Sequence, residues 1–225
     1  MDKIYGLVCQ CKTLQEMDSS NVFKSITRKT FSEVTAEHGK EKALEELGQK
    51  IVHNLDLTSS IIDFCQTNGI GHYRLSNSIF GLFLDDSLNL SLDALPNKES
   101  ILGGIKKVGM DAISKGVSLS IFPDLFNSLA SYNEETVERS ISEINFYSWF
   151  FDEMGLPKNL SNPIIVRVGE QVEGEAEHDN ITDFVDRFIE NYQKLDKSAR
   201  ARLAIQNAPK GRWNCINLFK YFHVY

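Results

Sequence analysis

The stretch EKALEELGQKIVHNLDLTSSIIDFCQTNGIGHYRLS, residues 41–76, indicates the fold class. Apolar residues recur there at steps of three and four, as on one face of a helix, at Leu44, Leu47, Ile51, Leu55 and Ile62. Gly69 then ends the helical pattern, and residues 70–76 predict a short strand. A helix that leads directly into a strand is the repeating unit of an α/β protein.

The same alternation continues through the chain. Patterns typical of strands occupy residues 3–9, 70–76, 117–122, 163–169 and 201–207. Patterns typical of helices occupy residues 41–68, 98–115, 133–154, 179–195 and 213–222. Residues 10–40 show no clear periodicity and predict a long excursion with at most one short helix. Parallel strands joined by helices follow, and periodicity alone leaves open a doubly wound sheet or a (β/α) barrel.

Composition restricts the class of protein. The net charge of −7 argues against a general nucleic-acid binder, which usually has a basic face. No apolar run approaches the roughly 18 residues that cross a bilayer, and the first residues lack the features of a signal peptide. The four cysteines show no metal-ligand spacing, so we interpret them as reduced thiols of a cytoplasmic protein.

A run within this pattern resembles a known family. NLDLTSSIIDFCQTNGIGHYRLSNSIF, residues 54–80, is similar to the UV damage endonucleases of the UvdE type. The matching residues are Asn54, Leu55, Asn68, Gly69, Tyr73, Arg74, Leu75 and Ser76. The likeness extends in register over roughly residues 3–220. It implies one UvdE-like domain over residues 1–225, with TIM-barrel-like (β/α) repeats in about five units that form an incomplete or distorted barrel.

The resemblance also implies a divalent metal cluster at the strand ends that hydrolyses DNA beside ultraviolet lesions. In this sequence the corresponding ligand positions hold Asp85 (or its neighbour Asp86), Phe122, Arg167 and Gln206. Phe122 has no donor atom, Arg167 is permanently cationic, and Gln206 is a weak neutral ligand. We therefore expect no metal cofactor and no catalytic residue.

Other residues near these positions are predicted to line a cleft. They are Tyr73, Arg74, Asp124, Phe126, Glu170 and Asn207. We expect Arg167 to pair with Asp85, Asp86 or Glu170, and we interpret His72 as a structural or solvated histidine.

The chain ends at Tyr225, whereas the family continues for three further strands. We therefore expect exposed sheet edges and an uncovered apolar face. Those surfaces predict a protein partner, self-association through a sheet edge and the apolar tail at 213–225, or a cover formed by residues 10–40.

These observations favour a non-catalytic, degenerate relative of the UV damage endonucleases that acts by protein binding. An inhibitor or decoy of a nucleic-acid enzyme is one form that the acidity suggests. The alternative is a divergent metal-dependent DNA endonuclease that repairs ultraviolet lesions with Mn or another divalent metal. It would use Asp85, Asp86, Asp124, Glu170 and Gln206. A third alternative is metal-free DNA binding through Tyr73, Arg74, Phe126 and Arg167, which the net charge disfavours. Nothing indicates a membrane.

Overall fold

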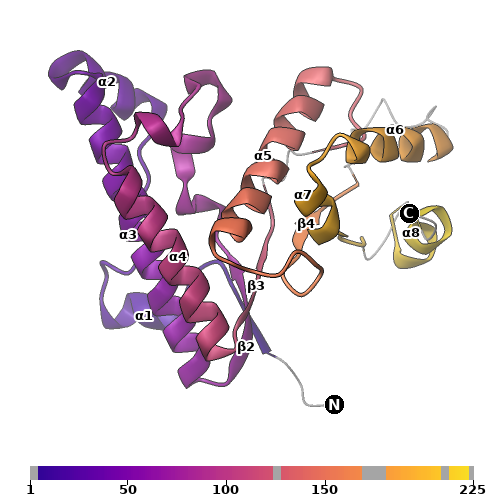
Figure 1. The fold of residues 1–225 in the computed structure, drawn as a ribbon, viewed down its shortest axis with the longest axis horizontal. Helices are drawn as coiled ribbons and strands as arrows, with labels where there is room; N and C mark the ends of the chain where they lie inside the picture. Colours follow the sequence, from indigo (N-terminus) through magenta and orange to yellow (C-terminus); the bar gives the residue numbers. More distant parts are fainter. Residues whose placement is uncertain (1–4, 124–127, 169–180, 209–212, 223–225) are drawn as a thin grey trace. The chain divides into compact units, whose positions relative to one another are not determined.

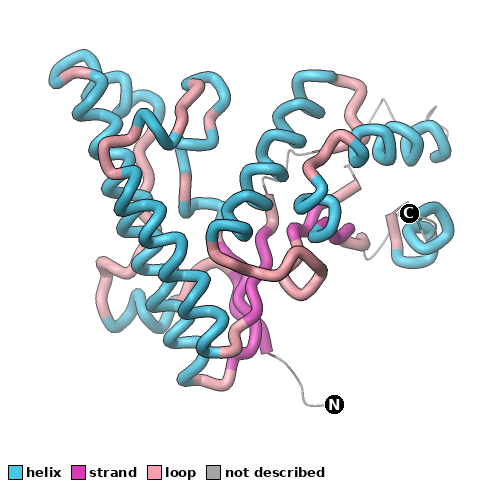
Figure 2. The backbone as a smooth tube through the Cα atoms, viewed as in Figure 1, coloured by secondary structure: helices cyan, strands magenta, loops and turns pink. Residues whose placement is uncertain are grey.

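The computed structural model of the protein describes residues 5–123, 128–168, 181–208 and 213–222 (Figure 1). The chain divides into two compact units. The first contains Met1–Ile121 and Phe150–Pro157, and the second contains Phe122–Trp149 and Lys158–Tyr225. Short strands alternate with longer helices along the chain, as Figure 2 shows.

A parallel sheet forms the centre of the first unit. Its strands are β1 (Tyr5–Val8), β2 (Ile70–Leu75) and β3 (Ser118–Ile121), and β2 pairs with both of the others. Helices α3 (Lys40–Thr67) and α4 (Lys98–Lys115) pack side by side against this sheet (Figure 1). These two helices and three strands confirm the elements that the apolar periodicity predicts.

Shorter helices complete the first unit. Between β1 and α3 lie α1 (Lys12–Met17) and α2 (Arg28–His38). Between β2 and α4 lie the 3₁₀ helices η1 (Asn77–Ile79), η2 (Gly81–Leu84), η3 (Asp86–Leu88) and η4 (Leu92–Ala94). The excursion at residues 10–40 therefore contains more helix than its sequence predicts.

The core of the first unit lies between the helices and one face of the sheet. The apolar stripe of α3 is buried, as predicted, at Leu44, Leu47, Ile51, Leu55 and Ile62. From the sheet it meets alternate residues of β2 and β3, which are at most 1% exposed: Tyr73, Leu75, Leu119 and Ile121. Side chains alternate between the faces of a strand, so the residues between these positions lie on the opposite face.

That opposite face is polar where we expected it to be apolar. It carries His72 and Arg74 from β2 and Ser118 and Ser120 from β3, and the register pairs His72 with Ser118 and Arg74 with Ser120. Parallel sheets normally bury apolar side chains on both faces. The expectation of an uncovered apolar face is therefore wrong for these two strands.

Asn54 of α3 fastens two loops to the core. Its side chain is 1% exposed, and its Oδ1 accepts a hydrogen bond from the backbone N–H of Lys24 at 2.7 Å. Its Nδ2 donates to the carbonyl oxygens of Lys24, Ser78 and Ile79 at 2.8, 3.2 and 3.0 Å. One amide thus holds both the segment before α2 and the turn after β2.

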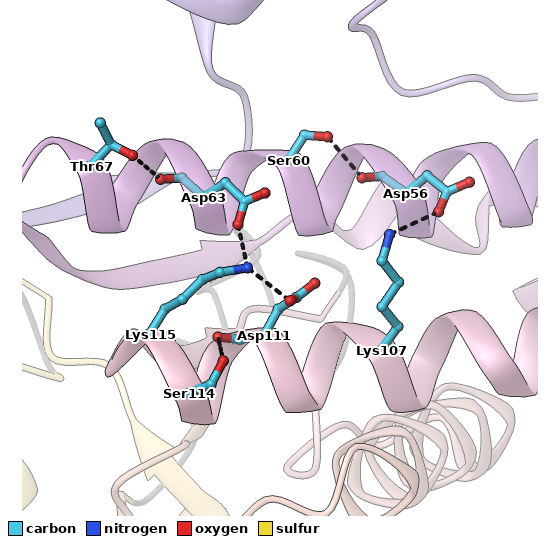
Figure 3. Close-up of polar contacts among 8 residues, drawn as sticks. All are labelled: Asp56, Ser60, Asp63, Thr67, Lys107, Asp111, Ser114 and Lys115. Carbon is cyan, nitrogen blue, oxygen red and sulfur yellow. Dashed lines mark hydrogen bonds and ion pairs between the residues drawn. The ribbon is translucent and has the colours of Figure 1, made fainter.

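Ion pairs tie α3 to α4 on the surface (Figure 3). Lys115 of α4 contacts Asp63 of α3 and lies 2.8 Å from Oδ1 of Asp111, one turn earlier in its own helix. Lys107 lies 3.5 Å from Asp56, farther along the same pair of helices. Exposed pairs of this kind contribute little individually and depend on salt.

The second unit has its own pair of parallel strands, β4 (Ile164–Val166) and β5 (Leu203–Ile205). Its helices are α6 (Ile181–Gln193), α7 (Lys197–Arg202), α8 (Cys215–Phe222) and most of α5 (Glu134–Glu153), which ends in the first unit. The periodicity predicts all of these except α7. Arg202 at the end of α7 is fully buried and donates to Oγ of Ser198 at 2.6 Å and to the Ser148 carbonyl at 3.3 Å.

Aromatic side chains hold α8 to the second unit. The Phe222 ring lies 5.2 Å from Phe188 and 6.3 Å from Trp213, and Trp213 lies 5.1 Å from Phe184. On the same helix Ile216 and Phe219 are 75% and 74% exposed. The described part of the predicted apolar tail is therefore packed on one side and open to solvent on the other.

Candidate functional site

Asp85 follows β2, where the resemblance implies a metal ligand, and its contacts are structural. Its carboxylate accepts hydrogen bonds from the Arg28 guanidinium, including one of 2.8 Å from Nη2, and caps η3 through the Ser87 N–H at 3.1 Å. Burial raises the pKa of Asp85, but these hydrogen bonds and the charge of Arg28 outweigh it and lower the pKa overall. The predicted pairing of Asp85 with Arg167 is replaced by this pair with Arg28.

The other three implied positions lie in the second unit, where Phe122 and Gln206 each contact Arg167. Arg167 directly follows β4, and its guanidinium carbon lies 5.6 Å from the centre of the Phe122 ring. The Arg167 Nε donates to Oε1 of Gln206, directly after β5, at 3.2 Å. The Gln206 N–H donates to the Val166 carbonyl at 2.8 Å and extends the pairing of β4 with β5. We call Phe122, Arg167 and Gln206 the arginine cluster.

The arginine cluster does not fit a divalent cation. Its arginine brings a full positive charge, which repels a metal ion, and its phenylalanine brings no ligand atom. The one neutral oxygen with ligand capacity, Oε1 of Gln206, already accepts a hydrogen bond from the arginine. Within the described ranges, moreover, no group of three or more His, Cys, Asp or Glu side chains is placed to hold a metal ion.

The predicted cleft residues divide into three groups. Arg74 is partly exposed on the polar face of the first sheet, and Asn207 is exposed beside Gln206. Tyr73 does not line a cleft, because it is fully buried and its hydroxyl donates to the Cys9 carbonyl at 2.7 Å. Asp124, Phe126 and Glu170 lie outside the residues that the structure describes.

Two residues that the structure brings to attention were not singled out from the sequence. Arg28 lies in the non-periodic excursion, 57 residues from Asp85. No local sequence pattern predicts that these two side chains pair. His72 was interpreted as structural or solvated, and both of its ring nitrogens hydrogen-bond to hydroxyls, at 2.8 Å to Ser118 and 2.8 Å to Ser120, as in a structural histidine. The alternation within β2 and β3 is the signal that could have placed these three side chains together.

Comparisons with known proteins show the family to which the chain belongs. The chain belongs to the UV-endonuclease UvdE family, whose sequence model matches residues 3–219. The UV DNA damage endonuclease of Nostoc sp. is 24% identical over 203 residues, which are 90% of this chain and 55% of that protein. The UV-damage endonuclease of Schizosaccharomyces pombe is 25% identical over 204 residues, which are 90% of this chain and 31% of that protein.

A solved structure shows the fold. The crystal structure of SacUVDE matches with a TM-score of 0.76 and 20% sequence identity, over 99% of this chain and 66% of that one. The likeness confirms a TIM-barrel-like fold rather than a doubly wound sheet, and this chain forms a partial barrel. The chain thus spans about half the Nostoc relative and about two thirds of SacUVDE. None of the described helices has the length and apolar character that a bilayer crossing requires.

Proposed function

We propose that this chain is a non-catalytic member of the UvdE family that acts by binding another protein. The observation that carries the proposal is the contact of Arg167 with Phe122 and Gln206. Three positions for which the resemblance implies metal ligands are occupied by side chains that satisfy one another. The fixed charge of arginine takes the place that a metal would hold, so metal-activated hydroxide has no support there.

Two described surfaces suit a protein partner. Helix α8 exposes Ile216 and Phe219, which are three residues apart and therefore share one face of the helix. Strand β1 exposes Tyr5 and Val8 at 65% and 48%. Exposed apolar residues and strand edges are typical of association sites. The net charge of −7 favours a basic partner surface, which agrees with an inhibitor or decoy of a nucleic-acid enzyme.

A metal assay and a cleavage assay test the loss of catalysis. The purified chain is dialysed against Mn²⁺ and Zn²⁺, and its metal content is measured by plasma mass spectrometry beside the Nostoc relative as control. The same samples are incubated with ultraviolet-irradiated plasmid and supplied metal. We expect no stoichiometric metal and no nicking. Stoichiometric metal together with metal-dependent nicking would establish the alternative, a divergent DNA endonuclease.

Light scattering tests the binding surfaces separately. If α8 mediates self-association, the double change Ile216→Ser and Phe219→Ser will lower the molar mass measured after size-exclusion chromatography. Met110→Ser is the matched control, since Met110 is 63% exposed and lies on α4, which carries neither surface. If the parent chain is monomeric, self-association is excluded. The double variant and its control are then compared for binding to a different protein.

A further inference from the structure

Strand β1 is an open edge of the first sheet. It pairs with β2 on one side, and three of its residues are exposed, with Tyr5 at 65% and Val8 at 48%. Exposed edge strands usually carry a charge, a proline or a bulge that prevents further pairing. The sequence YGLV of β1 has neither a charge nor a proline, and the register shift beside it skips Gly71 of β2, not a residue of β1. This edge therefore lacks the usual protection.

The backbone of β1 presents hydrogen-bonding groups to the open side. Along a strand, successive residues direct their N–H and C=O groups to alternate sides. The Cys9 N–H donates to the Arg74 carbonyl of β2 at 2.8 Å, so Leu7 also faces β2. Gly6 and Val8 consequently face away from β2. An incoming strand would meet their backbone groups.

A second copy of β1 fits this edge. Two identical strands related by a two-fold axis run antiparallel, and two-fold symmetry is the commonest among soluble oligomers. With the axis beside Leu7, the Val8 N–H of each copy donates to the Gly6 carbonyl of the other. The Gly6 N–H meets the Val8 carbonyl, which accepts from the Gln10 N–H at 2.7 Å and has a second lone pair.

The side chains suit the same register. Gly6 and Val8 lie on the polar face of the sheet, since the register pairs them with His72 and Arg74. Val8 of one copy lies opposite Gly6 of the other, which has no side chain to obstruct it. On the opposite face, Leu7 meets its own equivalent across the axis. Because β1 is uncharged, its residues place no like charges opposite one another.

We propose that β1 pairs with β1 of a second copy of this chain, antiparallel and centred on Leu7, so that the two sheets become continuous. This pairing rests on the protein-binding part of the proposed function and gives the β1 surface its partner. A strand of four residues buries far less than the roughly 1,200 Å² of a stable interface. The dimer is therefore weak and depends on the chain concentration.

Sedimentation equilibrium of the full chain tests the pairing. The chain is examined from roughly 10 μM to 1 mM, which spans the dissociation constants of weak complexes. We expect the average mass to rise from 25.5 kDa toward twice that value as the concentration increases. A mass that stays at 25.5 kDa throughout would overturn the pairing. That outcome would leave the metal and cleavage results unaffected, so the loss of catalysis is judged separately.

Two changes at Gly6 form a matched pair. Gly6→Pro removes an N–H that faces away from β2 and places the proline ring on the open edge. Gly6→Ala keeps the N–H, and its Cβ would lie no closer than 3.5 Å to His72. We expect Gly6→Pro to weaken dimerisation about tenfold or more, and Gly6→Ala to change it by less than about threefold. Equal effects of the two changes would refute the pairing.

Amide exchange gives a readout that needs no variant. The Val8 N–H should exchange with deuterium more slowly at high than at low chain concentration, because the dimer engages it. The Cys9 N–H already donates to Arg74 in the single chain, so it should exchange equally at both concentrations. NMR spectra measure both amides. A Val8 amide whose exchange is independent of concentration would contradict the proposal even if Gly6→Pro failed to fold.

The exposed face of α8 is distinguished by its own variant. The double change Ile216→Ser and Phe219→Ser leaves β1 intact and should preserve the concentration-dependent mass. A dimer that is lost in this variant and retained in Gly6→Pro would assign self-association to α8 and exclude β1.

Discussion

Arg167 and Gln206 are joined by a hydrogen bond of 3.2 Å, although each follows a different strand and occupies a position for which the UvdE resemblance implies a metal ligand. The bond is side chain to side chain, and it orients the guanidinium above the Phe122 ring. The Gln206 oxygen that could bind a cation is therefore already engaged by the arginine.

Replacing the three residues of the arginine cluster by metal-ligand side chains should create metal affinity. In the combined variant Phe122→His, Arg167→His and Gln206→Glu, we expect the affinity for Mn²⁺ to rise about tenfold or more. Removal of one repelling unit charge at about 4 Å is worth roughly 1 to 4 kcal/mol. Calorimetric titration measures the change, with Arg200→His on α7 as a control for loss of charge. Unchanged affinity in the combined variant would contradict our interpretation of the cluster.

Gly109 marks a close approach between α4 and the end of α5. A Cβ at this position would lie 2.0 Å from the carbonyl oxygen of Met154, so Gly109→Ala forces backbone atoms apart. We expect a loss of about 2 kcal/mol or more in the free energy of unfolding. Gly103→Ala on the same helix meets nothing within 4 Å and should raise stability by about 0.5 to 1 kcal/mol. The urea midpoints of the two variants should therefore shift in opposite directions from that of the parent chain.

Even an isosteric change of Asn54 should destabilise the fold. Asn54→Asp keeps the acceptor for the Lys24 N–H but turns three donated hydrogen bonds into contacts between oxygens. We expect a loss of about 3 kcal/mol or more, measured as a lower urea midpoint with an unchanged slope. His53→Ala, which removes one exposed contact of 3.1 Å, should cost less than about 1 kcal/mol. Similar effects of the two changes would show that the amide is not the fastening point.

The ion pairs of Lys115 should give a small, pH-dependent contribution to stability. Burial raises the pKa of Asp111, but the hydrogen bond from Lys115 and its charge outweigh it and hold the pKa below its usual 3.8. A lowered carboxyl pKa stabilises the fold above the unfolded value and loses that effect as the pH falls through the folded value. Lys115→Met should therefore cost about 0.5 kcal/mol at neutral pH and less below about pH 3.8.

Salt and a second lysine provide the checks for that prediction. Added salt should reduce the effect of Lys115→Met, since the Lys115 side chain is 25% exposed. Lys107→Met should cost less, because its single partner lies 3.5 Å away. Thermal unfolding followed at several pH values measures both. A loss of stability on Lys115→Met that becomes larger toward acidic pH would contradict this prediction.

Elements with a clear apolar period could be predicted from the sequence. The leucine stripe of α3 is one example, since burial of that stripe is what stabilises the helix. Helix α7 could not be predicted, because KSARAR has no apolar face and one of its two buried residues, Arg202, depends on distant hydrogen bonds. The polar face of β2 and β3 was also missed, since a strand pattern shows alternation but not which face packs.

The contacts among the candidate site residues could not be predicted from the sequence. The resemblance pointed to Phe122, Arg167 and Gln206, and the structure brings these three together. Their mutual contacts depend on how β4 and β5 align, which local sequence does not specify. The pair of Arg28 with Asp85 joins a segment without periodicity to a loop, so it becomes visible only in three dimensions.

The orientation of Arg167 has one further consequence. Imidazoles titrate near neutrality, and a bound ion can be stripped by a chelator or exchanged for another. The charge of an arginine side chain is permanent, and Gln206 and Phe122 hold this side chain at the end of β4. The electrostatic sign of this strand end is therefore the same in an acidic compartment, in neutral solution and under metal starvation, so any association that depends on it is constitutive rather than conditional.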